Sequence, residues 1–123
     1  MLILLVDDDS FLRDMYATKF KESGHEVDTA ASGEDGIKKV QEKNFDAVLL
    51  DMVMPGIDGI EFLESVLSEK KPDAKTKFIV LSNQSEESDK TAAEKAGAHG
   101  YIVKAESIPS DVVKKVESIC SVK

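Results

Sequence analysis

Five side chains in this sequence carry groups that could act together on an anion. Asp7, Asp8 and Asp51 supply carboxylates, Ser82 supplies a hydroxyl and Lys104 supplies an amine. Carboxylates bind hard divalent cations, and a cation, an ammonium and a hydroxyl are the groups that share the oxygens of a phosphoryl group. These residue types therefore point to metal-assisted chemistry on a phosphoryl group, provided that the fold brings them together.

The five residues lie where short apolar runs of the chain end. The runs cover residues 2–6, 47–50, 78–81 and 101–103. Continuous apolar runs of this length are typical of strands buried on both faces of a parallel sheet covered by helices. Because parallel strands all end at the same edge, we expect the polar groups to converge there.

The segments between these runs predict helices, and residues 26–30 alternate polar and apolar side chains like an edge strand. Five strand-helix units with right-handed crossovers predict a doubly wound α/β fold: a five-stranded parallel sheet of order 2-1-3-4-5, flavodoxin-like, with helices on both faces. We expect residues 1–123 to form a single domain. The expected helices cover about 10–23, 32–43, 58–70, 86–96 and a last one capped by Ser107 that almost reaches Lys123.

Two of these helices carry specific packing expectations. The first, capped by Asp9 or Ser10, is expected to turn Phe11 inward together with other large apolar residues. The fourth offers only alanines to the core, so it should be the most loosely held of the five. Its expected inner face contains Ala92, Ala93 and Ala96.

In this strand order the ligand-binding crevice lies between the first and third strands, where Asp7, Asp8 and Asp51 end them. Two carboxylates about 4 Å apart repel by about 4 kcal/mol at an effective dielectric of about 20, so a cation must offset them. Few hard oxygen ligands favour Mg²⁺, with Mn²⁺ as the other possibility, and no histidine or cysteine adjoins them to favour zinc. Lys104 is a second cation. Asp51 is the expected nucleophile because it is central and the turn 54–56 follows it.

The chain resembles the receiver domains of two-component response regulators over nearly its whole length. Four motifs carry this resemblance: LLVDDD at 4–9, LLDMVMPGIDG at 49–59, VLS at 80–82 and GYIVK at 100–104. Each is weak alone, but all four in this order and spacing are specific to the family.

The resemblance implies that Asp51 accepts a phosphoryl group in a Mg²⁺-dependent reaction, with Lys104 and Ser82 as its catalytic partners. It also implies that Asp8 and Asp51 bind Mg²⁺ directly together with the Val53 carbonyl, and that Asp7 binds it through water. The domain would catalyse its own phosphorylation and dephosphorylation, and it would not be a classical enzyme.

The resemblance further makes Ser82 and Tyr101 a switch pair that changes the surface formed by the fourth helix, fifth strand and fifth helix. The implied donor is a sensor histidine kinase, a phosphotransfer protein or a small phosphodonor. The implied reader of the switch is a downstream protein or effector domain. The protein is expected to be a monomer or a phosphorylation-dependent dimer. Its expected location is the cytoplasm.

Composition supports a protein partner. The formal net charge of -8 disfavours direct binding to nucleic acid or an anionic membrane. The single Cys120 excludes an intrachain disulfide and is expected to face the core. The apolar start 1–6 is too short for a targeting or membrane segment. His25 and His99 are expected to be solvated loop residues without partners.

Two other classes of protein are alternatives. A haloacid-dehalogenase-like phosphatase would use Asp7 as nucleophile and Asp9 as acid, but Phe11 stands where such enzymes need a small hydroxylated residue. A flavodoxin-like flavin binder would need a hydroxyl- and glycine-rich phosphate loop after the first strand. Three aspartates at that position repel a phosphate.

The clearest departure from the family is Lys104-Ala105, where receivers usually carry Lys-Pro with a cis peptide bond. A cis bond costs about 2.5–4 kcal/mol before alanine and about 0.5–1 kcal/mol before proline. We expect the cis bond to be retained because Lys104 is attracted to the carboxylates, and we then expect Ala105→Pro to be tolerated or stabilising. The sequence leaves open whether an effector domain accompanies this chain.

Overall fold

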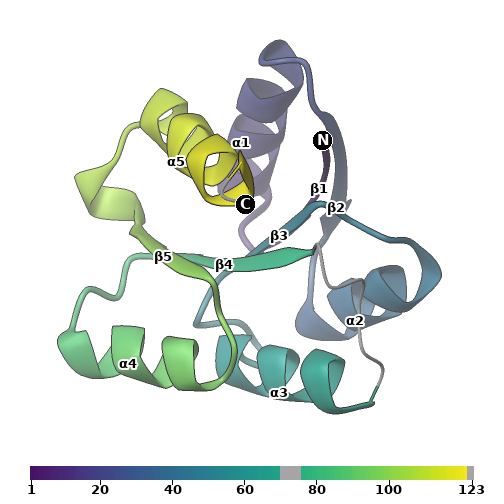
Figure 1. The fold of residues 1–123 in the computed structure, drawn as a ribbon, viewed down its shortest axis with the longest axis vertical. Coiled ribbons are helices and arrows are strands. Elements are labelled where there is room, and N and C mark those ends of the chain that lie inside the picture. The colour runs from purple at the N-terminus through teal and green to yellow at the C-terminus, as the bar shows by residue number, and fades with distance from the viewer. Residues whose placement is uncertain (70–75, 122–123) are drawn as a thin grey trace.

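A computed structural model describes residues 1–69 and 76–121. The expected ends of the third helix at Lys70 and of the last helix near Lys123 lie outside these residues. Strands and helices alternate along the chain as the sequence predicts (Figure 1). The strands are β1 (Leu2–Val6), β2 (Glu26–Ala30), β3 (Ala47–Leu50), β4 (Lys77–Ser82) and β5 (Gly100–Val103). The helices are α1 (Ser10–Glu22), α2 (Gly33–Glu42), α3 (Gly59–Glu69), α4 (Glu87–Lys95) and α5 (Pro109–Ser121), with a short 3₁₀ turn η1 (Lys104–Glu106).

The five strands form one parallel sheet in the order β2-β1-β3-β4-β5, which confirms the predicted topology. Val6 pairs with Leu50 across β1 and β3, and Leu50 pairs with Val80 across β3 and β4. Ser82 pairs with Val103 across β4 and β5. This register aligns the carboxyl ends of the four strands from which the site residues follow.

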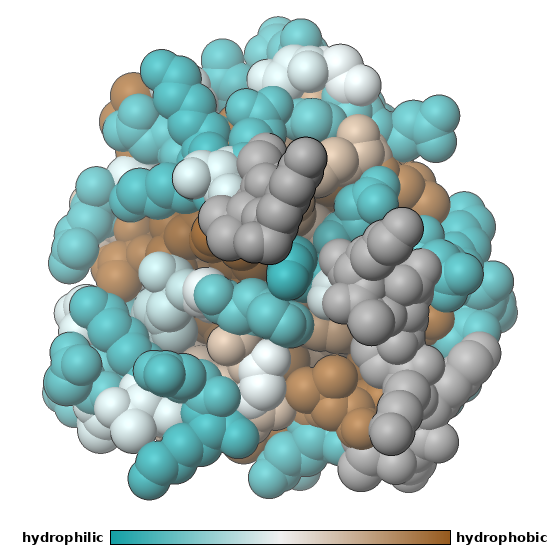
Figure 2. Space-filling model, viewed as in Figure 1, coloured by the Kyte–Doolittle hydropathy of each residue, from teal (hydrophilic) through white to brown (hydrophobic). Residues whose placement is uncertain are grey.

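Helices cover both faces of the sheet, as Figure 1 shows: α1 and α5 lie on one face, and α2, α3 and α4 lie on the other. Successive strand residues point to opposite faces, so Leu4 and Val6 pack in one core and Ile3 and Leu5 in the other. Large side chains of the helices close the two cores, with Phe62 of α3 in one and Phe20 of α1 in the other. Hydrophilic side chains cover most of the face in Figure 2, with smaller apolar areas between them.

The structure corrects the packing expected for three helices. Phe11 is 75% exposed because it lies about two and a half turns before Phe20, on the opposite side of α1. In α4 only Ala93 is buried, and Ala92 is exposed. The helix α5 begins at Pro109, and Ile108 rather than Ser107 precedes it directly, with its carbonyl oxygen accepting from the Asp111 and Val112 backbone N–H groups. The Ser107 hydroxyl instead accepts a hydrogen bond from Lys115 Nζ at 2.9 Å.

The two histidines have partners, contrary to the expectation that both are solvated and unpaired. His25 Nδ1 lies 3.0 Å from the Met1 amine, and its Nε2 lies 2.7 Å from Glu117 Oε2, because the α1–β2 loop packs against α5 and the chain start. His99 Nδ1 accepts a hydrogen bond from the Phe78 backbone N–H at 3.1 Å. Cys120 packs against the core, as expected. Within the described residues, no helix has the length and apolar character needed to cross a membrane.

Candidate functional site

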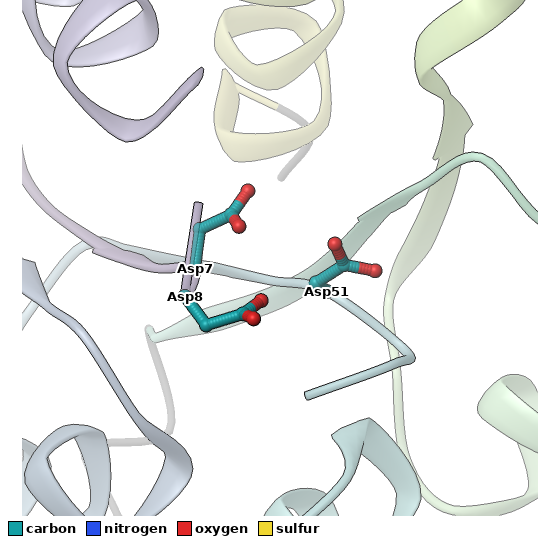
Figure 3. Close-up of side chains that lie close together, drawn as sticks. All are labelled: Asp7, Asp8 and Asp51. Atoms are coloured by element: carbon teal, nitrogen blue, oxygen red, sulfur yellow. The ribbon is translucent and has the colours of Figure 1, made fainter. Parts of the chain in front are cut away.

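Three carboxylates meet at the carboxyl edge of the sheet. Asp7 and Asp8 directly follow β1, and Asp51 directly follows the adjacent strand β3 (Figure 3). One oxygen of each carboxylate lies within 4.8 Å of an oxygen of the other two. The predicted convergence of these residues is therefore confirmed, and the parallel register of β1 and β3 is its cause.

Lys104 binds two of these carboxylates. Its Nζ donates to Asp7 Oδ2 at 2.9 Å and to Asp51 Oδ2 at 3.0 Å, and the Lys104 side chain is only 7% exposed. Burial alone would lower the pKa of Lys104, but the hydrogen bonds to Asp7 and Asp51 outweigh it and raise the pKa above 10.5. The ammonium is therefore fully charged at neutral pH, and it offsets part of the repulsion between the carboxylates.

Backbone N–H groups fix the remaining oxygens of the two aspartates that Lys104 binds. Asp7 Oδ1 accepts from the Asp9 backbone N–H at 2.9 Å, and Asp51 Oδ1 accepts from that of Val53 at 3.2 Å. Asp9 is the N-cap of α1, one of the two roles considered for it. The Asp8 carboxylate is exposed, and within the described residues it accepts no hydrogen bond.

This arrangement fits a divalent cation. The donors are hard carboxylate oxygens, few in number, and the exposed Asp8 leaves room for water ligands, as Mg²⁺ requires. The Val53 side chain is 59% exposed, so the loop after Asp51 is open to solvent on the same edge. No histidine or cysteine belongs to the cluster, which disfavours zinc.

The loop between Asp51 and α3 is held close to the site by Gly59. A Cβ at this position would lie 2.6 Å from the Asp51 carbonyl oxygen, so only glycine fits here without a shift of the backbone. Asp58 and Glu61 then start α3 with reciprocal side-chain to backbone hydrogen bonds: Glu61 N–H donates to Asp58 Oδ1 at 2.9 Å and Asp58 N–H to Glu61 Oε1 at 3.3 Å. The position of Asp51 is therefore coupled to the start of α3.

Ser82 and Tyr101 meet at the backbone of Gln84. Ser82 is 1% exposed, and its Oγ accepts from the Gln84 backbone N–H at 3.2 Å. The Tyr101 hydroxyl donates to the Gln84 carbonyl oxygen at 2.8 Å. Burial raises the pKa of Tyr101, so its hydroxyl remains a donor at neutral pH. A movement of Ser82 would thus reach Tyr101 through a single intervening residue.

The expected cis bond at Lys104-Ala105 is wrong, because no cis peptide bond occurs in the described residues. Lys104 still reaches Asp51 because it is the first residue of η1, and this turn directs its side chain back over the site. The attraction of Lys104 to the carboxylates was the reason for expecting a cis bond, and it is satisfied without one. The expectation that Ala105→Pro is tolerated loses its premise.

Sequence reasoning missed two residues of α1 that adjoin the site. Arg13 Nη1 donates to the Asp7 carbonyl oxygen at 2.8 Å, and Tyr16, three residues later, is 3% exposed and lies beside Asp7. Their spacing puts them on the same side of the helix, which was the available signal. Nothing in the sequence indicated that this side faces the carboxylates.

The model of the response regulator receiver domain family matches residues 3–117. The chain belongs to this family. It is therefore a receiver domain of a two-component system, and it acts as a phosphorylation-dependent signalling switch. Neither a haloacid-dehalogenase-like phosphatase nor a flavin binder is supported by the comparisons.

Among curated proteins, the receiver is 35% identical over 117 residues to the transcriptional regulatory protein ResD of Bacillus subtilis, covering 95% of this chain and 47% of ResD. It is also 35% identical over 102 residues to AfsQ1 of Streptomyces coelicolor, covering 83% of this chain and 44% of AfsQ1. The chain thus spans about half the length of the curated relatives it matches.

Solved structures of similar domains agree with the fold. The chemotaxis protein CheY4 of Vibrio cholerae superimposes with a TM-score of 0.88 at 28% identity, covering 96% of this chain and 97% of that one. The response regulator TrrA of Thermotoga maritima, solved in complex with Mg²⁺ and a beryllium fluoride, gives 0.81 at 34% identity, covering 96% and 97%. Receiver domains bind Mg²⁺ at an acidic pocket, and this receiver has an acidic cluster at the carboxyl edge of its sheet.

Proposed function

We propose that Asp51 is the phosphoacceptor of this receiver. A carboxylate oxygen of Asp51 would form a bond to phosphorus while the donor's bond to phosphorus breaks, and the histidine nitrogen or acetate oxygen of the donor would keep the electron pair. The observation that carries this proposal is the Lys104 ammonium, 3.0 Å from Asp51 Oδ2 and 2.9 Å from Asp7 Oδ2. A fixed cation at the point of reaction stabilises charge on the transferred group.

Mg²⁺ would be held by Asp8, Asp51 and the Val53 carbonyl, with Asp7 contributing through water, and Mn²⁺ could replace it. When bound, the metal supplies charge neutralisation for the phosphoryl oxygens. Lys104 and Ser82 are the residues proposed to contact that group from the protein side. Ser82 Oγ accepts a hydrogen bond from the Gln84 backbone N–H, so a movement of Ser82 toward the phosphoryl group would disturb the segment that joins β4 to α4.

The proposed switch passes from Ser82 to Tyr101 and changes the surface of α4, β5 and α5. Both residues now contact Gln84, in the segment that joins β4 to α4. The proposed phosphoryl donor is a sensor histidine kinase or a phosphotransfer protein, and the proposed location of the receiver is the cytoplasm. A downstream protein or an effector domain is proposed to bind the changed surface. We take residues 1–123 as one receiver domain, which is a monomer or a phosphorylation-dependent dimer. In this proposal the domain catalyses its own phosphorylation and dephosphorylation. It does not itself bind nucleic acid or a membrane.

Intact-mass measurement after incubation with acetyl phosphate and MgCl₂ tests the proposal. The wild type should gain one phosphoryl group, and Asp51→Asn should gain none. Asp14→Asn is the matched control, because Asp14 lies on the exposed side of α1 and should label like the wild type. Labelling that persists in Asp51→Asn and is lost in Asp7→Asn would overturn the proposal in favour of chemistry at Asp7.

A further inference from the structure

Tyr16 is a buried polar residue that the proposed mechanism does not use. Its side chain is 3% exposed and packs between α1 and the sheet. Within the described part of the chain its hydroxyl forms no hydrogen bond, and no fully enclosed side-chain nitrogen or oxygen there lacks a partner, so the hydroxyl still reaches solvent. Polar groups in such positions are almost always bound to protein or to water, so water is the partner expected for this hydroxyl.

A small cavity adjoins this hydroxyl and the site. It is lined by Asp7, Arg13, Tyr16, Asp51 and apolar residues of β1, β3 and β4. Its volume of about 10 Å³ corresponds to about one water molecule, and a bound water needs two to four polar partners. The lining residues whose side chains carry polar groups are Tyr16, Arg13, Asp7 and Asp51.

Asp7 is the carboxylate whose charge acts on Tyr16. Burial raises the pKa of Tyr16, the charge of Lys104 lowers it and the charge of Asp7 raises it further. The hydroxyl is therefore within electrostatic reach of the Asp7–Lys104 pair. Asp7 already accepts one hydrogen bond on each oxygen, from Asp9 N–H and Lys104 Nζ, and a carboxylate can accept about four.

We propose that Tyr16 is a positioning residue for the metal site, acting through one water in this cavity that bridges its hydroxyl and the Asp7 carboxylate. This inference rests on the proposed role of Asp7 in binding Mg²⁺. Groups that orient the ligands of a metal typically contribute about 10–100-fold in affinity. Because Asp7 would bind through water and Tyr16 acts through a second water, the effect of Tyr16 belongs at the lower end.

The test is a titration of MgCl₂ into wild type and Tyr16→Phe at pH 7, followed by the backbone amide shifts of Asp8 and Val53 in two-dimensional NMR. Phenylalanine keeps the ring in the core and removes only the hydroxyl. Tyr16→Phe should bind Mg²⁺ about tenfold more weakly. Thr18→Val is the matched control, because it removes a hydroxyl from the exposed side of the same helix, where Thr18 Oγ1 donates to the Asp14 carbonyl oxygen at 2.9 Å.

The outcomes separate the two claims. A wild type whose Asp8 and Val53 amides do not respond to Mg²⁺ would overturn the proposed metal site itself. A wild type that binds Mg²⁺ while Tyr16→Phe and Thr18→Val bind it equally well would overturn only the role of Tyr16. A purely structural role would change the unfolding free energy of Tyr16→Phe and leave its Mg²⁺ affinity unchanged.

Discussion

Replacing Lys104 by methionine should destabilise the receiver strongly in the absence of Mg²⁺. The substitution keeps an unbranched side chain and removes the charge that lies 2.9 Å from Asp7 and 3.0 Å from Asp51. Each pair contributes about 5.5 kcal/mol of attraction at an effective dielectric of about 20, and desolvation offsets much of it. Removing one partner of a buried ion pair typically costs about 3–5 kcal/mol. Because the Asp51 side chain is 15% exposed and solvent reaches it, we expect about 3 kcal/mol.

The pH dependence has a defined sign. The pKa of Lys104 is raised in the folded state by its hydrogen bonds to Asp7 and Asp51, which outweigh the opposing effect of burial. Its contribution to stability is therefore complete below the unfolded value of 10.5 and is lost as the pH rises through the folded pKa. At pH 7 the wild type has the whole contribution, so the comparison with Lys104→Met is made there.

Urea denaturation followed by circular dichroism, with and without MgCl₂, measures the difference in unfolding free energy. Mg²⁺ at 100 times its dissociation constant stabilises a folded protein by about 2.7 kcal/mol. It should stabilise the variant more than the wild type, because no ammonium competes for the carboxylates. Lys115→Met is the control: Lys115 is exposed and should change stability by less than about 0.5 kcal/mol. A loss below about 1 kcal/mol for Lys104→Met, or a difference that Mg²⁺ does not narrow, would refute this reasoning.

Three further predictions concern the surroundings of the site. Gly59→Ala should lower the unfolding free energy by about 2 kcal/mol and slow labelling by acetyl phosphate, because the alanine Cβ would clash with the Asp51 carbonyl oxygen. An unfolding free energy and a labelling rate equal to those of the wild type would contradict this prediction. The helix α4 buries only Ala93, and its N-cap makes no side-chain hydrogen bond. Hydrogen exchange should therefore show α4 as the least protected helix and as the helix most changed by a phosphoryl mimic. Protection equal to that of α5 would argue against this prediction. Burial and the charge of Lys77 lower the pKa of His99 in the folded protein. The contribution of neutral His99 to stability is therefore present above pH 6.5, and it is lost as the pH falls through the folded pKa. His99→Gln should remove this part of the acid sensitivity, and an unchanged pH profile would exclude His99 as its source.

The sequence alone determined the order of elements and which polar residues meet at the carboxyl edge of the sheet. Apolar runs and helical periodicity are local patterns, so they predicted the five strands and the sheet order that the structure confirms. The convergence of Asp7, Asp51 and Lys104 followed from the same reasoning, because parallel strands place their carboxyl ends at one edge. A residue at the end of a buried strand can be assigned to an edge without knowledge of its side-chain contacts.

Only the tertiary structure decided features that depend on how separate elements face each other. The inward side of α1 contains Tyr16 and not Phe11, because the rotation of a helix against a sheet is set by how its side chains pack in the core beneath it. The same holds for the partners of His25, which come from the chain start and from α5. The trans bond after Lys104 reflects the turn η1 that follows β5. These contacts join residues far apart in the sequence, and their geometry exists only once the helices have packed onto the sheet.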